Sequence, residues 1–289
     1  MSLQGMQTPA AVTTLQHRCT QCDGVVEPEL VSVYPSSQVC LECMAEVERE
    51  RLEKELNQVQ QLDRSLLPDI PVVSGWEVGL HYRPSRLLSG DFYDVRREDD
   101  GRLTLLIGDV MGKGIPAAFL RAGLQSSLKA LAPEVGSPAQ VLEKANRNFL
   151  GSTSPGRLAS VFLGALDTVT GELRYANGGH LPPLLRRASG TWQALAATGM
   201  VLGALSNAAY SEATRTLEPG DLLVLFSDGF TEAENSTLDV FDEREITRRI
   251  DRWPGLPAQV LASALAEELA SFAPGEPSDD RTLLTLRRT

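Results

Sequence analysis

The stretch "LLVLFSDGF" (residues 222–230) gives the first clear structural indication in this sequence. Five apolar residues followed by polar residues are typical of a buried strand. The run is followed by Ser227 and the carboxylate of Asp228, and Gly229 comes next. Asp-Gly is a common turn pair, because Asp tolerates unusual backbone angles and Gly readily adopts positive φ. The stretch therefore predicts a strand and a turn, and other segments must show whether Asp228 has a chemical role.

Other carboxylates occupy the same kind of position, where an apolar strand meets a loop. They are Asp91 in "SGDFYD" (89–94), Asp109 in "LLIGDVMGKG" (105–114), and Asp279 with Asp280 in "SDDRTLLTL" (278–286). Hard divalent ions such as Mg²⁺ and Mn²⁺ prefer carboxylate and water oxygens in octahedral geometry. The recurrence predicts a metal site built from carboxylates that several strands deliver to one common edge.

Runs rich in β-forming residues, separated by turn residues, begin at about residue 69, as antiparallel strands require. They cover residues 76–83, 92–98, 103–110, 160–167, 171–177, 181–187, 221–227 and 282–288. Helical periodicity is found in residues 116–131, 138–150 and 257–272. Consecutive strands with helices in separate blocks predict an α+β fold, with layered sheets and helices outside them.

Length and composition indicate a globular protein. The 289 residues suit one domain of about 200 residues with a smaller appendage. The net charge of −11 argues against a nucleic acid as the main partner, because phosphate backbones attract basic patches. No apolar stretch approaches the length of a membrane span, and residues 1–16 do not resemble a secretion signal. We therefore expect a cytoplasmic protein with a flexible tail over residues 1–16.

All four cysteines lie close together, as "CTQC" (19–22) and "CLEC" (40–43). Two C-x2-C pairs at this spacing are typical of a zinc ribbon, in which four thiolates surround one Zn²⁺. Residues 17–43 are therefore predicted to be a zinc-ribbon-like module with Cys19, Cys22, Cys40 and Cys43 as ligands. Two alternatives remain: two disulfides, which a cytoplasmic protein disfavours, or a site that has lost its metal.

Residues 44–68 are predicted to be a helical linker that ends at Pro68. Leu52, Val59 and Leu66 repeat every seven residues and form a narrow apolar stripe. Such a stripe suits a short coiled coil that would make a homodimer, or docking on the next domain. The alternative is a solvated linker helix.

Five motifs follow one another in a specific order: "SGDFYDV", "IGDVMGKGIPAAFL", "YANGGHLPPLL", "FSDGFTEAEN" and "SDDRTLLTLR". The series resembles the metal-dependent protein serine/threonine phosphatases (type 2C-like). Within them it is similar to the bacterial branch typified by stage II sporulation protein E and by stress-response regulators of partner-switching systems. The resemblance covers about residues 60–289, and the cysteines lie outside it.

The resemblance implies a four-layer α-β-β-α fold, a β-sandwich flanked by helices, over residues 69–289. It also implies a centre of two Mn²⁺ or Mg²⁺ ions at one end of the sandwich. Asp109 would bridge the ions and Val110 would offer its carbonyl. The remaining ligands would be Asp91, Asp228 and either Asp279 or Asp280, with Asp279 favoured. Arg86 stands where some relatives hold phosphate.

The function implied is hydrolysis of phosphoserine or phosphothreonine, with Asp109 and Asp228 as the central catalytic residues. The resemblance implies an anti-sigma-factor antagonist as the protein substrate. No cysteine lies in residues 69–289, which excludes a thiol-phosphatase mechanism there. Two alternatives are a catalytically silent scaffold with the same fold, and a binding protein that acts through its zinc module.

Overall fold

The structure, a computed structural model, describes residues 17–27, 30–31 and 37–289. The tail expected over residues 1–16 lies outside the described part. The chain forms two compact units, residues 1–57 and 58–289. None of the described helices is both long and apolar enough to cross a membrane.

The smaller unit has its own core of apolar and cysteine side chains. Cys19, Val26, Leu30, Cys40 and Leu52 are buried together. Leu52 belongs to helix α2 (Glu46–Ser65), which continues past the end of this unit. The helix lies within residues 44–68, where a helical linker was predicted, and its charged sequence carries only a narrow apolar stripe.

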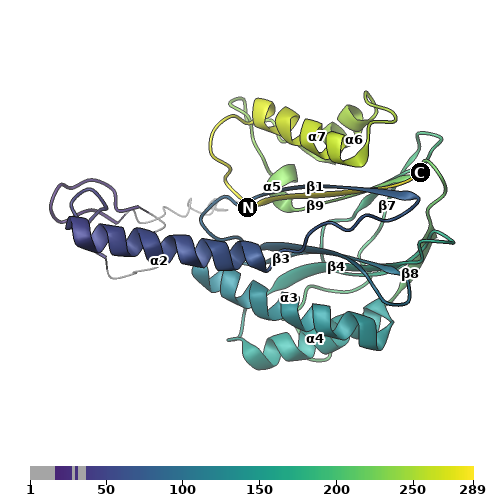
Figure 1. Cartoon of the computed structure of the whole chain (residues 1–289), viewed down its shortest axis with the longest axis horizontal. Coiled ribbons are helices and arrows are strands. Elements are labelled where there is room, and N and C mark those ends of the chain that lie inside the picture. The colour runs from purple at the N-terminus through teal and green to yellow at the C-terminus, as the bar shows by residue number, and fades with distance from the viewer. Residues whose placement is uncertain (1–16, 28–29, 32–36) are drawn as a thin grey trace, which may run out of the picture. The chain divides into compact units, whose positions relative to one another are not determined.

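The larger unit contains two five-stranded antiparallel sheets (Figure 1). The first has the order β1-β10-β9-β6-β7, and its strands are β1 (Trp76–Arg83), β10 (Arg281–Arg288), β9 (Leu222–Phe226), β6 (Leu184–Arg186) and β7 (Trp192–Ala194). The second has the order β2-β3-β4-β5-β8, and its strands are β2 (Asp91–Arg97), β3 (Leu103–Val110), β4 (Ala159–Leu166), β5 (Glu172–Gly178) and β8 (Ala213–Thr216).

The two sheets pack face to face through a shared apolar core. Val95, Leu105 and Ile107 of the second sheet contact the same cluster as Leu225 and Leu284 of the first. These side chains alternate along their strands with residues that face the helices, as expected for strands buried on both faces. The sandwich is therefore the centre of the unit.

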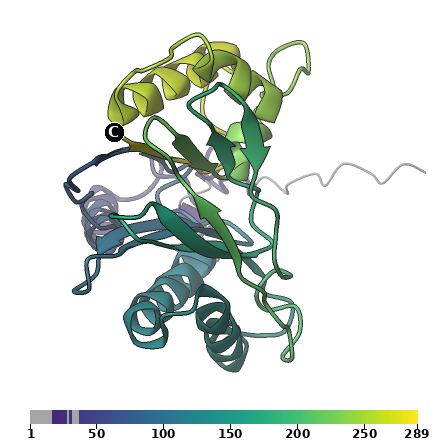
Figure 2. The same ribbon diagram turned by 90° about the vertical axis from the view of Figure 1, so that its right-hand side faces the viewer.

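Helices cover both outer faces of the sandwich (Figures 1 and 2). Helices α3 (Ile115–Val135) and α4 (Pro138–Ser152) pack on the second sheet through a core that includes Leu124, Leu142 and Phe149. Helices α6 (Glu243–Ile250) and α7 (Ala258–Phe272), with the short α5 (Asp228–Thr231), cover the first sheet. The predicted α-β-β-α layering is confirmed.

Local sequence explains where the two helices on the second sheet begin and end. Both α3 and α4 have a proline in their first turn, where no backbone donor is needed. Ser137 caps α4 by accepting a hydrogen bond from the Gln140 N–H. Gly136 ends α3 in the left-handed conformation, at φ 70°. The start of α3 is thereby placed directly after the loop that follows Asp109.

Candidate functional site

Asp91 and Asp109 lie opposite each other on neighbouring strands β2 and β3. Opposed residues of an antiparallel pair point to the same face of the sheet, and here it is the face toward the other sheet. Gly90 lies beside them. A Cβ atom on Gly90 would come within 3.0 Å of Asp109 Oδ1 and 2.8 Å of the Val110 carbonyl oxygen. Two oxygens that the sequence assigned to a metal centre therefore border one glycine.

Asp228 is the first residue of α5, directly after Ser227 at the end of β9. The predicted turn at Asp228-Gly229 is wrong, because the chain begins a short helix there. Gly229 does not have a positive φ. Instead, a Cβ atom on Gly229 would overlap the backbone carbonyl of Asp280. Glycine is required by this close approach, which brings the Asp228 segment against the Asp279–Asp280 segment.

Asp279 and Asp280 have different surroundings. The Asp280 carboxylate accepts hydrogen bonds from the Ser85 N–H and Oγ, at 2.7 and 2.9 Å, from Ser89 Oγ at 2.7 Å and from the Gly90 N–H at 2.8 Å. Four donors occupy most of the lone pairs of a carboxylate. The Asp279 side chain is 35% exposed and pairs with Lys113 Nζ at 2.8 Å. Asp280 therefore anchors the loop before Asp91, while Asp279 is the more available ligand.

The carboxylates raise one another's pKa. The pKa of Asp109 is raised to about 7 by burial and then by the charges of Asp228, Asp279 and Asp280. Burial and the charge of Asp279 raise the pKa of Asp228 to about 6. The pKa of Asp91 is raised well above its usual value, by burial and then by Asp109. Negative charge is thus concentrated here, and a divalent cation would stabilise it.

Lys113 is the cation closest to this group in the described structure. Its ammonium lowers the pKa of both Asp109 and Asp228, although it is the smallest of the causes given for each. It also donates a hydrogen bond to the Ser278 carbonyl at 2.6 Å. The ion pair of Lys113 with Asp279 joins segments that are far apart in sequence, so local spacing could not predict it.

A hydrogen bond crosses between the two sheets at the same place. Thr282 Oγ1, at the start of β10, donates to Asp91 Oδ2 at 2.6 Å. Asp94 is not part of this group. It lies three residues after Asp91 on the opposite face of β2, beside Arg96 at 3.3 Å.

Arg86 and His180 lie in different surroundings. Arg86 is exposed in the segment between β1 and β2, and it makes no hydrogen bond or ion pair within the described residues. His180 is 4% exposed, and its Nδ1 lies 2.8 Å from Ser160 Oγ. Ser160 is opposite Asp109 in the β3–β4 pairing. His180 is therefore a buried residue close to the strand end that carries Asp109.

The four cysteines of the smaller unit converge. Their sulfur atoms all lie within 4.8 Å of one another, and all four are free thiols. Cys22 Sγ and Cys40 Sγ are 3.7 Å apart. Four sulfurs at about 2.3 Å from a tetrahedral Zn²⁺ are separated by about 3.8 Å. The Gln21 and Gly24 N–H groups each donate to a sulfur at 3.4 Å, so the donor set and its surroundings fit zinc.

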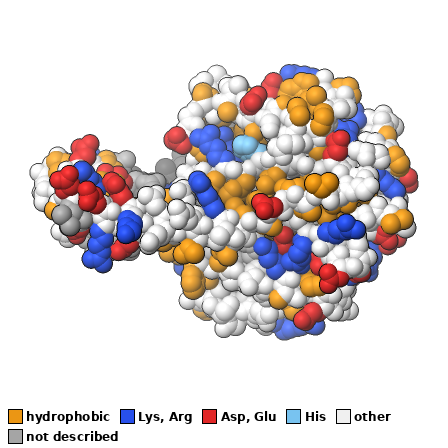
Figure 3. All heavy atoms as spheres, in the orientation of Figure 1, with side chains coloured by type: hydrophobic (Ala, Val, Ile, Leu, Met, Phe, Trp, Pro, Cys, Tyr) orange, Lys and Arg blue, Asp and Glu red, His pale blue; other side chains and the backbone are white. Residues whose placement is uncertain are grey.

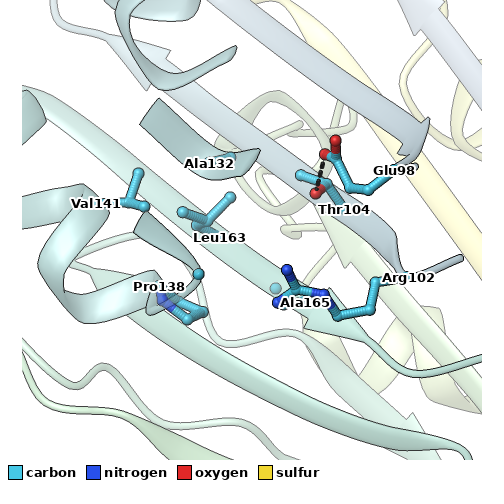
Figure 4. Close-up of a pocket in the computed structure, with 10 residues that line it drawn as sticks. Glu98, Arg102, Thr104, Ala132, Pro138, Val141, Leu163 and Ala165 are labelled. Carbon is cyan, nitrogen blue, oxygen red and sulfur yellow. Dashed lines mark hydrogen bonds between the residues drawn. The ribbon is translucent and has the colours of Figure 1, made fainter. Parts of the chain in front are cut away.

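A small pocket lies elsewhere, between the second sheet and the C-terminal end of α3 (Figure 4). Its lining is mostly apolar and includes Ala132, Val141 and Leu163. The carboxylate of Glu98 at its rim already accepts a hydrogen bond from Thr104 Oγ1 at 2.6 Å. None of the strand-end carboxylates lines this pocket, so it is separate from the candidate site.

Comparison with protein families gives one match. Residues 99–289 match the family model described as "Stage II sporulation protein E (SpoIIE)". This range includes Asp109, Asp228 and Asp279, and it covers most of the larger unit.

Individual relatives agree with this match. The chain is 29% identical to the phosphoserine phosphatase RsbU of Bacillus subtilis, over 83% of this chain and 72% of that protein. It is 24% identical to the protein IcfG of Synechocystis, over 81% of this chain but only 41% of IcfG. The structure of the SiaA-PP2C domain of Pseudomonas aeruginosa is 21% identical, with a TM-score of 0.75 over 84% of this chain and 99% of that domain.

Proposed function

Because the chain belongs to the family of the stage II sporulation protein E, we propose that it is a metal-dependent protein serine/threonine phosphatase. The observation that carries the proposal is the concentration of carboxylates, from four separate segments, at one end of the sandwich. Asp109, Asp228 and Asp279 influence one another electrostatically although they are far apart in sequence. Hard oxygen donors without cysteine or an available histidine suit Mg²⁺ or Mn²⁺.

The proposed ligands of two ions are the carboxylates of Asp91, Asp109, Asp228 and Asp279 and the carbonyl of Val110. Asp109, whose pKa is raised by burial and by the neighbouring carboxylates, is the proposed bridge. When bound, two divalent ions supply a water of lowered pKa and neutralise charge on the phosphoryl oxygens. Asp109 and Asp228 are the residues on which catalysis depends most directly.

Surrounding residues hold these carboxylates in place. Thr282 fixes one oxygen of Asp91 through the hydrogen bond between the sheets. Asp280 fixes Ser89 and Gly90, so the loop that precedes Asp91 has a defined position. Rigid support of this kind lowers the reorganisation needed when substrate binds.

The proposed substrate is phosphoserine or phosphothreonine on an anti-sigma-factor antagonist. This rests on the likeness to RsbU, which is named a phosphoserine phosphatase, and on the family. The setting proposed is the cytoplasm, with a protein and not a nucleic acid as partner, in agreement with the net charge of −11. A silent scaffold is less well supported, because every proposed ligand is present.

For the smaller unit we propose one structural Zn²⁺ held by Cys19, Cys22, Cys40 and Cys43. We also propose that α2 makes a homodimer. Three apolar residues beyond residue 57, in α2 or directly after it, are exposed to solvent: Val59 by 36%, Leu62 by 67% and Leu66 by 41%. Exposed apolar residues at heptad spacing suit a short coiled coil.

A phosphate-release assay tests the proposed function. The full chain is titrated with Mn²⁺ and Mg²⁺ in the presence of p-nitrophenyl phosphate and of phosphoserine peptides. We expect hydrolysis that depends on the divalent ion and is lost in Asp109→Asn. If the full chain with either ion hydrolyses none of these substrates, the phosphatase proposal is wrong.

A further inference from the structure

Two arginines lie directly opposite each other in the first sheet. The register pairs Arg83, the last residue of β1, with Arg281, the first residue of β10. Cβ atoms of opposed residues are about 4.5–5.5 Å apart and lie on the same face, so the like charges repel. In a chain with a net charge of −11, such a pair calls for an explanation.

Arg281 lacks an internal counter-ion. The residue is 5% exposed, and its Nε atom is buried without a hydrogen-bond partner. Within the described residues its guanidinium makes no hydrogen bond and no ion pair. Burial lowers the pKa of Arg281, and the charge of Arg83 lowers it further. Buried polar groups are normally paired, and within the described structure the Nε of Arg281 is not.

Arg83 has only a weak partner. Its Nη2 lies 3.4 Å from Oε2 of Glu276, whose side chain is 90% exposed. Exposed pairs of this kind contribute little, since water competes for both groups. The loose pair with Glu276 therefore leaves Arg281 without a partner among the described residues, and the position of Glu276 indicates that a carboxylate fits beside Arg83.

A histidine extends the positive face. His81 lies two residues before Arg83 on β1, and alternate residues of a strand share a face. Its ring lies edge-on to Phe230 of α5, with ring centroids 6.0 Å apart. The charges of Arg281 and Arg83 add to burial in lowering the pKa of His81. On the face shown in Figure 3, basic side chains lie beside a histidine on the larger unit.

This face is close in sequence to the carboxylate centre but points the other way. Thr282, next to Arg281, faces the second sheet, where it donates to Asp91. Arg281 therefore points outward, toward the helices on the first sheet. The charge of Arg281 is not among the causes that shift the pKa of Asp109 or Asp228. The arginine pair and the carboxylate group therefore lie near the same end of β10 but carry opposite charge.

We propose that Arg83, Arg281 and His81 form a docking site for an acidic segment of a protein partner, anchored by a carboxylate on the two guanidinium groups. Arg–carboxylate pairs are strong where they are shielded from water, and two parallel hydrogen bonds give them direction. The bound carboxylate displaces Glu276 from Arg83 and satisfies Arg281. That the partner is the phosphoprotein substrate rests on the function proposed above, whereas the binding itself does not.

Fluorescence anisotropy of the full chain with Mg²⁺ tests the docking site. The probe is a labelled oligoglutamate peptide that carries no phosphoryl group. Arg83→Gln and Arg281→Gln each weaken binding about tenfold or more, as expected for loss of a charge-assisted hydrogen bond. Glu276→Gln removes the internal competitor and tightens binding about two- to fivefold. Arg215→Gln, on strand β8 of the other sheet, leaves binding unchanged.

The proposal is overturned if the wild-type chain does not bind the probe, or if Arg83→Gln and Arg281→Gln bind as the wild type does. Equal weakening by Arg215→Gln would also overturn it, because binding would then follow net charge alone. Should Arg281→Gln fail to fold, the opposite effects of Arg83→Gln and Glu276→Gln remain decisive. Both residues are substantially exposed, with side chains 43% and 90% accessible.

Steady-state kinetics test whether the docking site affects the choice of substrate. Arg83→Gln raises KM for a phosphoserine peptide rich in glutamate, and leaves kcat/KM for p-nitrophenyl phosphate unchanged. A matched peptide with glutamine in place of glutamate shows no difference between variant and wild type. If no phosphopeptide is hydrolysed at all, the proposed function fails, while the anisotropy result still decides the docking site.

Discussion

Gly229 and Asp280 approach each other so closely that no side-chain atom fits between Gly229 and the Asp280 carbonyl. The contact joins the residue after Asp228 to the residue after Asp279. It therefore sets the spacing between two of the proposed metal ligands. A single methyl group at this position would push the two segments apart.

We expect Gly229→Ala to lower the free energy of unfolding by about 1–3 kcal/mol, as for other overpacked sites. Mn²⁺ affinity, measured by calorimetry, should fall with it. Gly123→Ala in α3 is the control, since nothing lies within 4 Å of its Cβ position. That variant should be more stable by about 0.4–1 kcal/mol. Equal stability of the two variants would contradict the overlap.

Asp109→Asn should abolish metal-dependent phosphate release, by at least about 100-fold, because the bridging charge worth several kcal/mol is lost. Calorimetry should also show fewer bound Mn²⁺ ions. Asp94→Asn is the control, since Asp94 is also an aspartate of this sheet but is buried on the other face of β2. It should retain metal-dependent hydrolysis. If Asp94→Asn lost hydrolysis and Asp109→Asn kept it, the metal site would lie on the face of the sheet that carries Asp94.

The full chain should contain one Zn²⁺, as measured by elemental analysis. Cys40→Ser should remove it, because a hydroxyl is a poor replacement for a thiolate ligand. In the wild-type chain, chelation should expose all four thiols to a thiol reagent, since Cys19 and Cys40 are buried in the folded unit. Full thiol reactivity in the untreated chain, without zinc, would rule out the metal site.

Asp63 forms a buried ion pair with Arg121, whose side chain is fully inaccessible. Two of the three guanidinium nitrogens of Arg121, Nε and Nη1, have no partner within the described residues, so Asp63 is its charge partner. Asp63→Asn should cost about 3–5 kcal/mol in chemical denaturation, because it leaves a buried charge unpaired. The double variant Asp63→Leu, Arg121→Met should recover most of that loss. A cost below 1 kcal/mol for Asp63→Asn would mean that water reaches Arg121.

His180 should make stability depend on pH. Its pKa in the folded protein is lowered to about 4 by burial, from 6.5. Below pH 6.5 the unfolded chain therefore binds a proton that the folded chain excludes, so stability falls as the pH falls toward 4. Between pH 7 and pH 5 the loss is about 2 kcal/mol. His180→Asn should remove this component from the pH profile of unfolding, and identical profiles for the two proteins would refute it.

The sequence predicted the longer strands well, because runs of seven or eight residues rich in β-forming types give a clear pattern. Strands β1 and β3 have the predicted bounds, residues 76–83 and 103–110. The edge strands β7 and β8 were not predicted, since they are only three and four residues long and mostly exposed. Helix α6 was also missed, because its eight residues are mostly charged.

The candidate site was predictable only in part. Asp91, Asp109, Asp228 and Asp279 could be selected because each lies where a strand meets a loop. The ion pair of Lys113 with Asp279 and the four donors to Asp280 could not, because they join segments more than 160 residues apart. The opposed arginines, Arg83 and Arg281, required the β1–β10 register, which no local pattern contains.

The position of β10 inside the first sheet has a consequence for synthesis of the protein. This strand lies between β1 and β9, and Thr282 contacts Asp91 across 191 positions of sequence. At about 5–20 residues per second, the ribosome needs roughly 10–40 s to make that interval. A nascent chain thus carries β1 without a strand partner and Asp91 without Thr282 until β10 emerges. We therefore expect metal-dependent hydrolysis only from chains whose translation has passed β10.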